Sequence, residues 1–123
     1  MHIRLFASLC ASILELQYPV DFSVGAVTAA DAEGTGYPAD QIDGIYFGYH
    51  LGKLAHTIKV AENPCRGLYE VIAHEFAHAY VFENHENAKD HGRSFVLACR
   101  LLRKELTGFG VPVKALYLRN TDK

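Results

Sequence analysis

The amino-acid sequence predicts an α+β domain. Apolar residues recur at helical spacing near the N-terminus and through the second half of the chain, whereas alternation with a period of two is confined to the region between them. The resulting order of helix, strands, helix and helix is typical of α+β folds. The 123 residues are enough for one hydrophobic core, so we expect a single domain over residues 1–123.

Composition narrows the class of protein. Hydrophobic residues make up 50% of the chain and charged residues 21%, which is typical of a globular protein rather than a disordered one. The formal net charge of −2 gives no overall basic field to attract nucleic acid. No apolar run reaches the roughly 18 residues of a membrane helix, so no membrane partner is expected.

Three cysteines are present: Cys10, Cys65 and Cys99. The number is odd and no C-x-x-C pair exists, so neither a disulfide framework nor a zinc ribbon is encoded. We therefore expect reduced, partly buried thiols in a protein of the cytoplasm or nucleoid.

Residues 3–16 are expected to form the first helix. An apolar stripe of Leu5, Leu9, Ile13 and Leu16 predicts it, and Tyr18-Pro19 ends it. The first residues also look like a short signal peptide, but no clear cleavage site follows, so the helix is the favoured interpretation.

Three strands are expected next, at 20–28, 44–51 and 54–61, with a loop at 29–43. The last two strands form a candidate hairpin around the turn at Gly52-Lys53. One face of the last strand carries Leu54, His56, Ile58 and Val60.

Two helices should follow. The first begins at Asn63-Pro64 and continues to about Glu83. Asp90 can cap the second, over about 91–106, which Gly108 would end. Its predicted buried side consists of Phe95, Ala98, Cys99, Leu102 and Leu106. Residues 111–119 are expected to add a short strand.

The first of these helices contains His74-Glu75-Phe76-Ala77-His78. Residues four apart lie on one helix face, so two imidazoles can reach one ion at roughly 2.0–2.1 Å. Glu75 lies about 100° around the helix axis, which places its carboxylate beside the metal, where it can act as general base toward a water molecule. Val71, Ile72, Phe76 and Ala79 would pack this helix into the core.

A catalytic zinc site usually has three protein ligands. His85 would lie about 10 Å beyond His78 on a continuous helix, so it could serve only if the helix ended early. The polar segment 84–92 can return the chain and bring His91 back to the pair. We favour His91, with Glu86 and Glu105 as alternatives.

The HExxH segment at 74–78, followed by His91-Gly92-Arg93-Ser94-Phe95, resembles the SprT-like (Spartan-type) metallopeptidase family, over roughly residues 43–119. The resemblance implies a zincin-like fold with Zn²⁺ held by His74, His78 and His91, and with Glu75 as catalytic base. It also implies hydrolysis of peptide bonds in a protein or peptide substrate. The family includes a protease of DNA–protein crosslink repair.

Several aspects of function stay open. We expect no C-terminal zinc ribbon of the kind that many family members have. DNA is an open partner, suggested only by basic residues of the last helix: Arg100, Arg103 and Lys104. The alternatives to a peptidase acting on DNA-associated proteins are a catalytically silent, zinc-stabilised DNA- or protein-binding module and a DNA-independent zinc peptidase. We expect a monomer.

Three further predictions concern the surroundings of the motif. An extended substrate is expected along a sheet edge, with the hairpin 44–61 as the first candidate. His50 and His56 in this hairpin are expected to be ordinary half-buried residues rather than substrate contacts. The carboxylates that orient the ligand imidazoles could come from Asp43, Glu70 or Asp90.

Overall fold

A computed structural model describes residues 2–50, 53–64, 67–85, 92–111 and 113; the side chains of 49, 50 and 85 are outside this description. The elements are α1 (Ile3–Ile13), β1 (Val20–Val24), α2 (Ala29–Ala32), the 3-10 turn η1 (Ala39–Gln41), β2 (Gly44–His50), β3 (Lys53–Val60), α3 (Leu68–His85) and α4 (Arg93–Gly108). This order confirms the α+β class.

The three strands form one mixed sheet in the order β1-β3-β2. β2 and β3 are antiparallel, which confirms the hairpin, and Tyr46 lies opposite Ile58. β1 runs parallel to β3, with Val20 beside His56. β1 ends at Val24, short of the predicted residue 28, because Gly25 leaves the ladder after one more hydrogen bond to the carbonyl of Val60.

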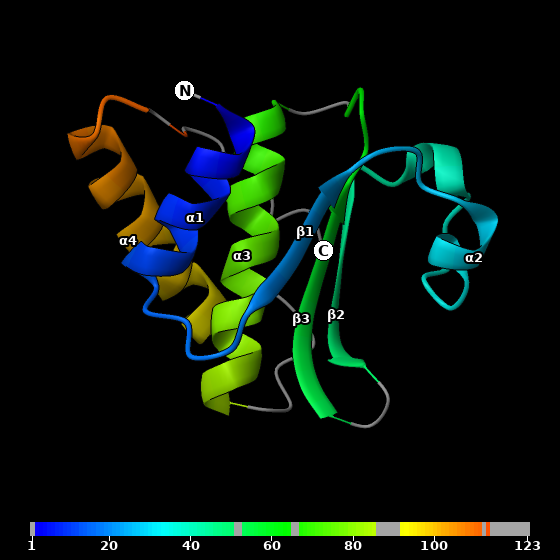
Figure 1. Cartoon of the computed structure of the whole chain (residues 1–123), viewed down its shortest axis with the longest axis horizontal. Coiled ribbons are helices and arrows are strands. Elements are labelled where there is room, and N and C mark those ends of the chain that lie inside the picture. The colour runs from blue at the N-terminus through cyan, green and yellow to red at the C-terminus, as the bar shows by residue number, and fades with distance from the viewer. Residues whose placement is uncertain (1, 51–52, 65–66, 86–91, 112, 114–123) are drawn as a thin grey trace.

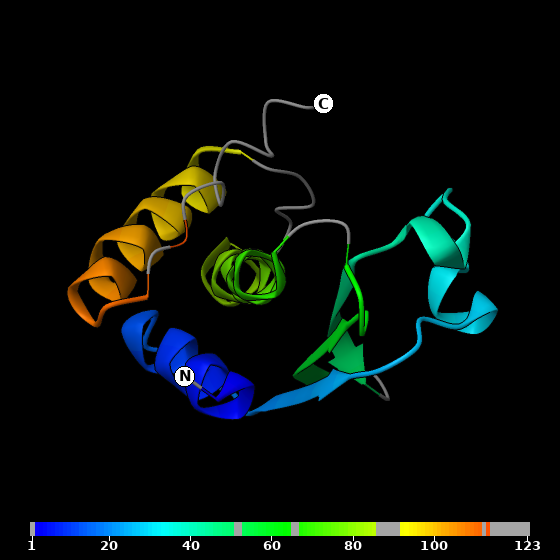
Figure 2. The same ribbon diagram turned by 90° about the horizontal axis from the view of Figure 1, so that it is seen from above.

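Helix α3 is the centre of the molecule. It lies between the sheet on one side and α1 and α4 on the other, and it contacts all of these elements (Figures 1 and 2). The segment containing α2 and η1 lies beyond the sheet, away from α3. A helix surrounded in this way must be apolar on most of its circumference.

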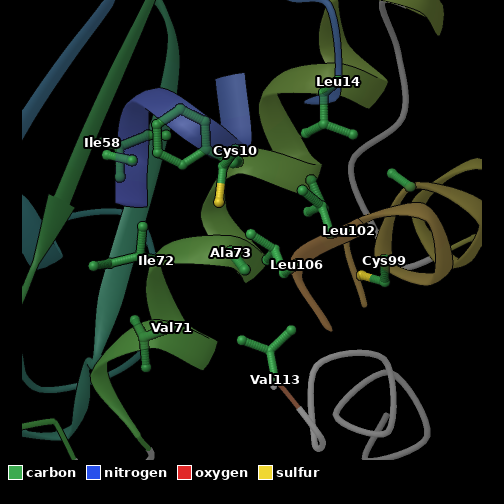
Figure 3. Close-up of a cluster of buried hydrophobic side chains, with 14 of the residues drawn as sticks. Cys10, Leu14, Ile58, Val71, Ile72, Ala73, Cys99, Leu102, Leu106 and Val113 are labelled. Atoms are coloured by element: carbon green, nitrogen blue, oxygen red, sulfur yellow. The ribbon is translucent and has the colours of Figure 1, made fainter. Parts of the chain in front are cut away.

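The sequence of α3 meets this requirement. Every residue from Val71 to Ala77 is buried, and so are Ala79 and Val81. Figure 3 shows Val71, Ile72 and Ala73 of α3 in one cluster with side chains from α1, β3 and α4. The predicted buried side of α4 is confirmed in full. This core holds the polar residues of α3 on a rigid support.

The first helix is confirmed, although it ends at Ile13 rather than at residue 16. Three residues of the predicted stripe are partly buried against the core (Leu9, Ile13 and Leu16), but the most deeply buried face lies beside that stripe. Phe6, Cys10 and Leu14 enter the core, whereas Leu5, expected in the buried stripe, is 59% exposed. Successive residues of a helix point about 100° apart around its axis, so a stripe that starts one residue later lies on a different face of the helix. The large ring of Phe6 determines the orientation, since it packs 4.6 Å from the ring of Tyr69 in α3, centroid to centroid.

The predicted loop at 29–43 contains short helical segments. Thr28 and Asp31 form a capping box: the Thr28 hydroxyl accepts from the Asp31 N–H at 3.1 Å, and the Asp31 carboxylate accepts from the Thr28 N–H at 2.9 Å. The Lys59 ammonium of β3 donates to Asp31 at 2.7 Å. The pKa of Asp31 is therefore lowered to about 2, first by Lys59 and then by Thr28.

The start of α3 differs from its prediction. The helix begins at Leu68 rather than at Asn63-Pro64. The Gly67 carbonyl accepts from the Val71 N–H at 3.0 Å, and the Glu70 carboxylate lies back over Gly67. A glutamate three residues after the cap is a recognised device for helix starts. Glu70 therefore marks the start of α3, the role that Asn63 was expected to have as the helix cap.

The remaining boundaries involve residues outside the described ranges. Gly92, not Asp90, is the N-cap of α4, because the Val96 N–H donates to the Gly92 carbonyl. Asp90 itself and most of the predicted strand at 111–119 are not described, although Val113 is buried in the core.

Two cysteines can be assessed. Cys10 and Cys99 are free and buried, as predicted, whereas Cys65 lies outside the described residues. Burial raises the pKa of both thiols, that of Cys99 to about 12.

Among the residues that the structure describes, no helix is long and apolar enough to cross a membrane.

Candidate metal centre

His74, Glu75 and His78 lie within about one turn of α3. His74 and Glu75 are each only 5% exposed, and His78 is half-buried. Burial of three such side chains is costly unless each has a polar or metal partner. Their placement on the central helix gives them little freedom to move.

The two imidazoles are spaced as joint ligands of one ion should be. Their ring centroids lie 5.0 Å apart, with the ring planes at 75°. A zinc–nitrogen distance of about 2.0–2.1 Å places the ion roughly 3.2 Å from each centroid, so tetrahedral coordination requires centroids about 5.2 Å apart. The donor type and the spacing both fit zinc.

Phe95 brings the start of α4 to this pair. Its ring lies 4.8 Å from that of His74 and 4.5 Å from that of His78, centroid to centroid. Phe95 is in the first turn of α4, whose N-cap is Gly92. The chain therefore returns to the histidine pair close to the position where the third ligand was predicted.

The predicted third ligand, His91, lies outside the described residues, and so does Glu86. The ranges that are described contain no group of three or more side chains able to bind one metal ion. Two other candidates are placed unfavourably. α3 continues through His85, so the helix does not end early. Glu105 is exposed and lies about 15 Å along α4 from Phe95.

Glu75 lies against the beginning of β2. A Cβ atom on Gly44 would be 3.0 Å from Oε2 of Glu75 and 3.1 Å from its Cγ. Only glycine leaves space for the carboxylate at this position. The contact places Glu75 between its own helix and β2, an edge strand of the sheet that the structure describes.

Comparison with protein families gives a match over the region that contains this site. The model of the SprT-like family matches residues 49–115, which is 67 of the 123 residues. This chain belongs to the SprT-like family. The matched segment contains most of the hairpin together with α3 and α4, and the family is associated with zinc. No curated protein and no solved structure matches the chain.

One polar residue of the SprT-like chain, His56, was expected to be half-buried and is instead almost fully buried. His56 is 1% exposed, and its Nε2 lies 2.6 Å from the Glu83 carboxylate, while its Nδ1 lies 2.7 Å from the Tyr46 hydroxyl. His56 therefore faces the core, as its alternation with Ile58 and Val60 had indicated. That alternation was the available signal, although its partners could not be inferred from it.

Two of the carboxylates expected near the ligands can be placed in the SprT-like domain. That of Glu70 lies over Gly67 at the start of α3. Asp43 is half-buried, immediately precedes Gly44, and its carbonyl accepts from the Ala61 N–H at 2.7 Å. Asp90 is outside the described residues.

Basic residues of the SprT-like domain line a shallow hollow on α4. Arg100, Arg103, Lys104 and Thr107 surround about 430 Å³. Arg100 and Lys104 are exposed, and Arg103 is half-buried.

Proposed function

We propose that this SprT-like protein is a zinc-dependent endopeptidase, in which His74, His78 and His91 hold Zn²⁺ and Glu75 is the general base. The observation that carries the proposal is the 5.0 Å separation of the His74 and His78 ring centroids, which fits two ligands of one tetrahedral ion. The buried Glu75 beside this pair supports catalysis rather than a purely structural ion.

Covalent geometry supports His91 as the third ligand. His91 directly precedes Gly92, so their Cα atoms are about 3.8 Å apart. Gly92 caps the helix whose first turn carries Phe95, and Phe95 contacts both imidazoles. No comparable restraint supports Glu86, which is separated from Gly92 by five residues.

When bound, zinc supplies Lewis acidity, polarising the scissile carbonyl and lowering the pKa of water toward about 7. The remaining steps belong to the protein. Glu75 accepts the proton of the attacking water and then delivers it to the leaving amine nitrogen. Glu75 is buried and lies against Gly44, so little reorganisation is needed for these transfers.

We further propose that the substrate is an extended peptide that pairs with β2. Within the hairpin 44–61, β3 is the central strand and β2 is an edge of the described sheet. A peptide paired with this edge would pass the start of β2, where Gly44 contacts Glu75. Backbone hydrogen bonds would then bring the scissile bond to the general base.

The first test is the zinc content of purified protein, measured by elemental analysis. We expect about one zinc per chain, lost or strongly weakened in His91→Ala and retained in His2→Ala, a matched control at the exposed cap of α1. Glu75→Gln should keep zinc and fold but lose cleavage of fluorescein-labelled casein. Absence of bound zinc from the wild type, even after Zn²⁺ is added, would refute the proposal.

Two other functions remain distinguishable. If Glu75→Gln cleaves as well as the wild type, Glu75 is not the base; if neither protein cleaves while zinc is bound, the silent binding module is favoured.

The hollow beside Arg100 and Lys104 supports a test of DNA dependence. Stimulation by single-stranded DNA that declines with salt, and declines further in Arg100→Ala/Lys104→Ala, would favour action on DNA-associated proteins. No stimulation would favour a DNA-independent peptidase.

A further inference from the structure

A chain of hydrogen bonds lies beside the histidine pair and joins four parts of the fold. Tyr46 of β2 is linked to His56 of β3 at 2.7 Å, and His56 is linked to Glu83 of α3 at 2.6 Å. Glu83 also accepts from the backbone N–H groups of Gln17 and Tyr18, which precede β1. We call Tyr46, His56 and Glu83 the buried relay.

The direction of these bonds follows from the carboxylate. Glu83 accepts the two backbone N–H groups and, as a carboxylate, also accepts from Nε2 of His56. In neutral His56 the other ring nitrogen, Nδ1, then accepts from the Tyr46 hydroxyl. Each member of the relay therefore has a defined partner, and the hydroxyl end of the Tyr46 ring is held in place.

The ring of Tyr46 in turn contacts a residue of the proposed metal centre. It is nearly parallel to the imidazole of His78, at 18° and 6.4 Å between centroids. Phe95 of α4 contacts the same imidazole at 4.5 Å. His78 is thus held by rings from β2 and α4, and the Tyr46 ring is itself anchored by the relay.

We propose that Tyr46 is a positioning residue for His78, held by His56 and Glu83, and that it thereby strengthens zinc binding. This inference rests on the proposed function. A hydrophobic side chain could fill the same space without placing polar atoms in the core, where they are costly unless fully bonded. The relay instead restricts the Tyr46 ring to one orientation, which a purely apolar contact would not do.

The test measures the affinity for Zn²⁺ by competition with a chromophoric chelator. Tyr46→Phe keeps the ring but removes the hydroxyl, and His56→Leu removes its acceptor. We expect each to weaken zinc binding about tenfold, the lower end of the effect of residues that orient metal ligands. Leu106→Ala is the matched control, because it opens the core on α4, far along the helix from Phe95.

Glu83→Gln provides a conservative comparison. Its amide oxygen can take the position of Oε2 and still accept from Gln17, Tyr18 and Nε2 of His56, because all three donors reach Oε2. His56 would then keep its tautomer, with Nδ1 still accepting from the Tyr46 hydroxyl, while the NH₂ group takes the position of Oε1 beside the Gln17 N–H. Because the geometry is kept, zinc affinity should stay within about threefold of the wild type, whereas a loss equal to that of Tyr46→Phe would contradict the inference.

Three outcomes separate this inference from the proposed function. A wild type that binds no zinc refutes the proposed function and the inference with it. If the wild type binds zinc and Tyr46→Phe and His56→Leu bind it equally well, only the inference is overturned. The inference is also overturned if Leu106→Ala weakens zinc binding as much as Tyr46→Phe and His56→Leu do. The absorption spectrum of the Co²⁺-substituted proteins, sensitive to ligand geometry, should change in Tyr46→Phe and not in Leu106→Ala.

Discussion

Gly44→Ala tests the position of the general base. The new Cβ would lie 2.8 Å from Cγ1 of Val71, 3.0 Å from Oε2 of Glu75 and 3.1 Å from its Cγ. Carbon atoms in good contact are about 3.5–4.0 Å apart, so Val71 must move by roughly 0.7 Å or more. The Glu75 carboxylate must also move away from β2.

The expected consequences follow from these displacements. Overpacking of a core typically costs about 1–3 kcal/mol of the free energy of unfolding. Misplacement of a reacting group by about 1 Å can cost 10²-fold in rate, so we expect kcat to fall about 10–100-fold. The three heavy atoms nearest to the new Cβ belong to Val71 and Glu75 rather than to His74 or His78, so zinc content should not change.

The assay is the rate of cleavage of fluorescein-labelled casein at saturating substrate, together with zinc content and thermal denaturation. Gly25→Ala is the matched control, since a Cβ at Gly25 meets nothing within 4 Å. Its kcat should equal that of the wild type. The reasoning is wrong if Gly44→Ala retains wild-type kcat, or if its loss of activity is explained by loss of zinc.

Three further predictions concern stability. Gly48→Ala would place a Cβ 2.6 Å from the Phe82 ring, so we expect a loss of about 1–3 kcal/mol in denaturant unfolding, not seen in Gly25→Ala. The pKa of Cys99 is raised to about 12, so its contribution to stability is present below the ordinary value near 9 and is lost as pH rises from there to about 12. Cys99→Ala should flatten this decline in the unfolding free energy. The pKa of Asp31 is lowered to about 2, so its contribution is present above about pH 4 and is lost as pH falls toward 2. Carboxyl NMR titration should find this low pKa in the wild type and a higher one in Lys59→Met.

The parts of the fold that depend on local geometry could be predicted from the sequence. The one-turn spacing of His74 and His78 follows from helix geometry alone, and the structure places both rings side by side. The buried face of α4 follows from its apolar spacing, and the hairpin from the alternation of its strands. Each of these inferences needs only residues that are close in the chain.

The errors have equally physical causes. The capping box at Thr28 and Asp31 lies in a segment rich in glycine and aspartate. This composition is typical of turns, so the segment was predicted to be a loop and the short helix α2 was missed. The face that α1 buries most deeply could not be deduced from its own pattern, because Phe6, Cys10 and Leu14 form a second apolar stripe beside the predicted one. Contact between Phe6 and Tyr69 of α3 decided between them.

The sequence by itself determined the family, the central helix and the HExxH residues on it. Tertiary structure decided what surrounds them: Gly44 against Glu75, Phe95 against both histidines, and the buried relay behind His78. These contacts join residues from different strands and helices. They exist only once the register of the sheet and the rotation of α3 against it are set, and both depend on packing of the whole core rather than on any local pattern.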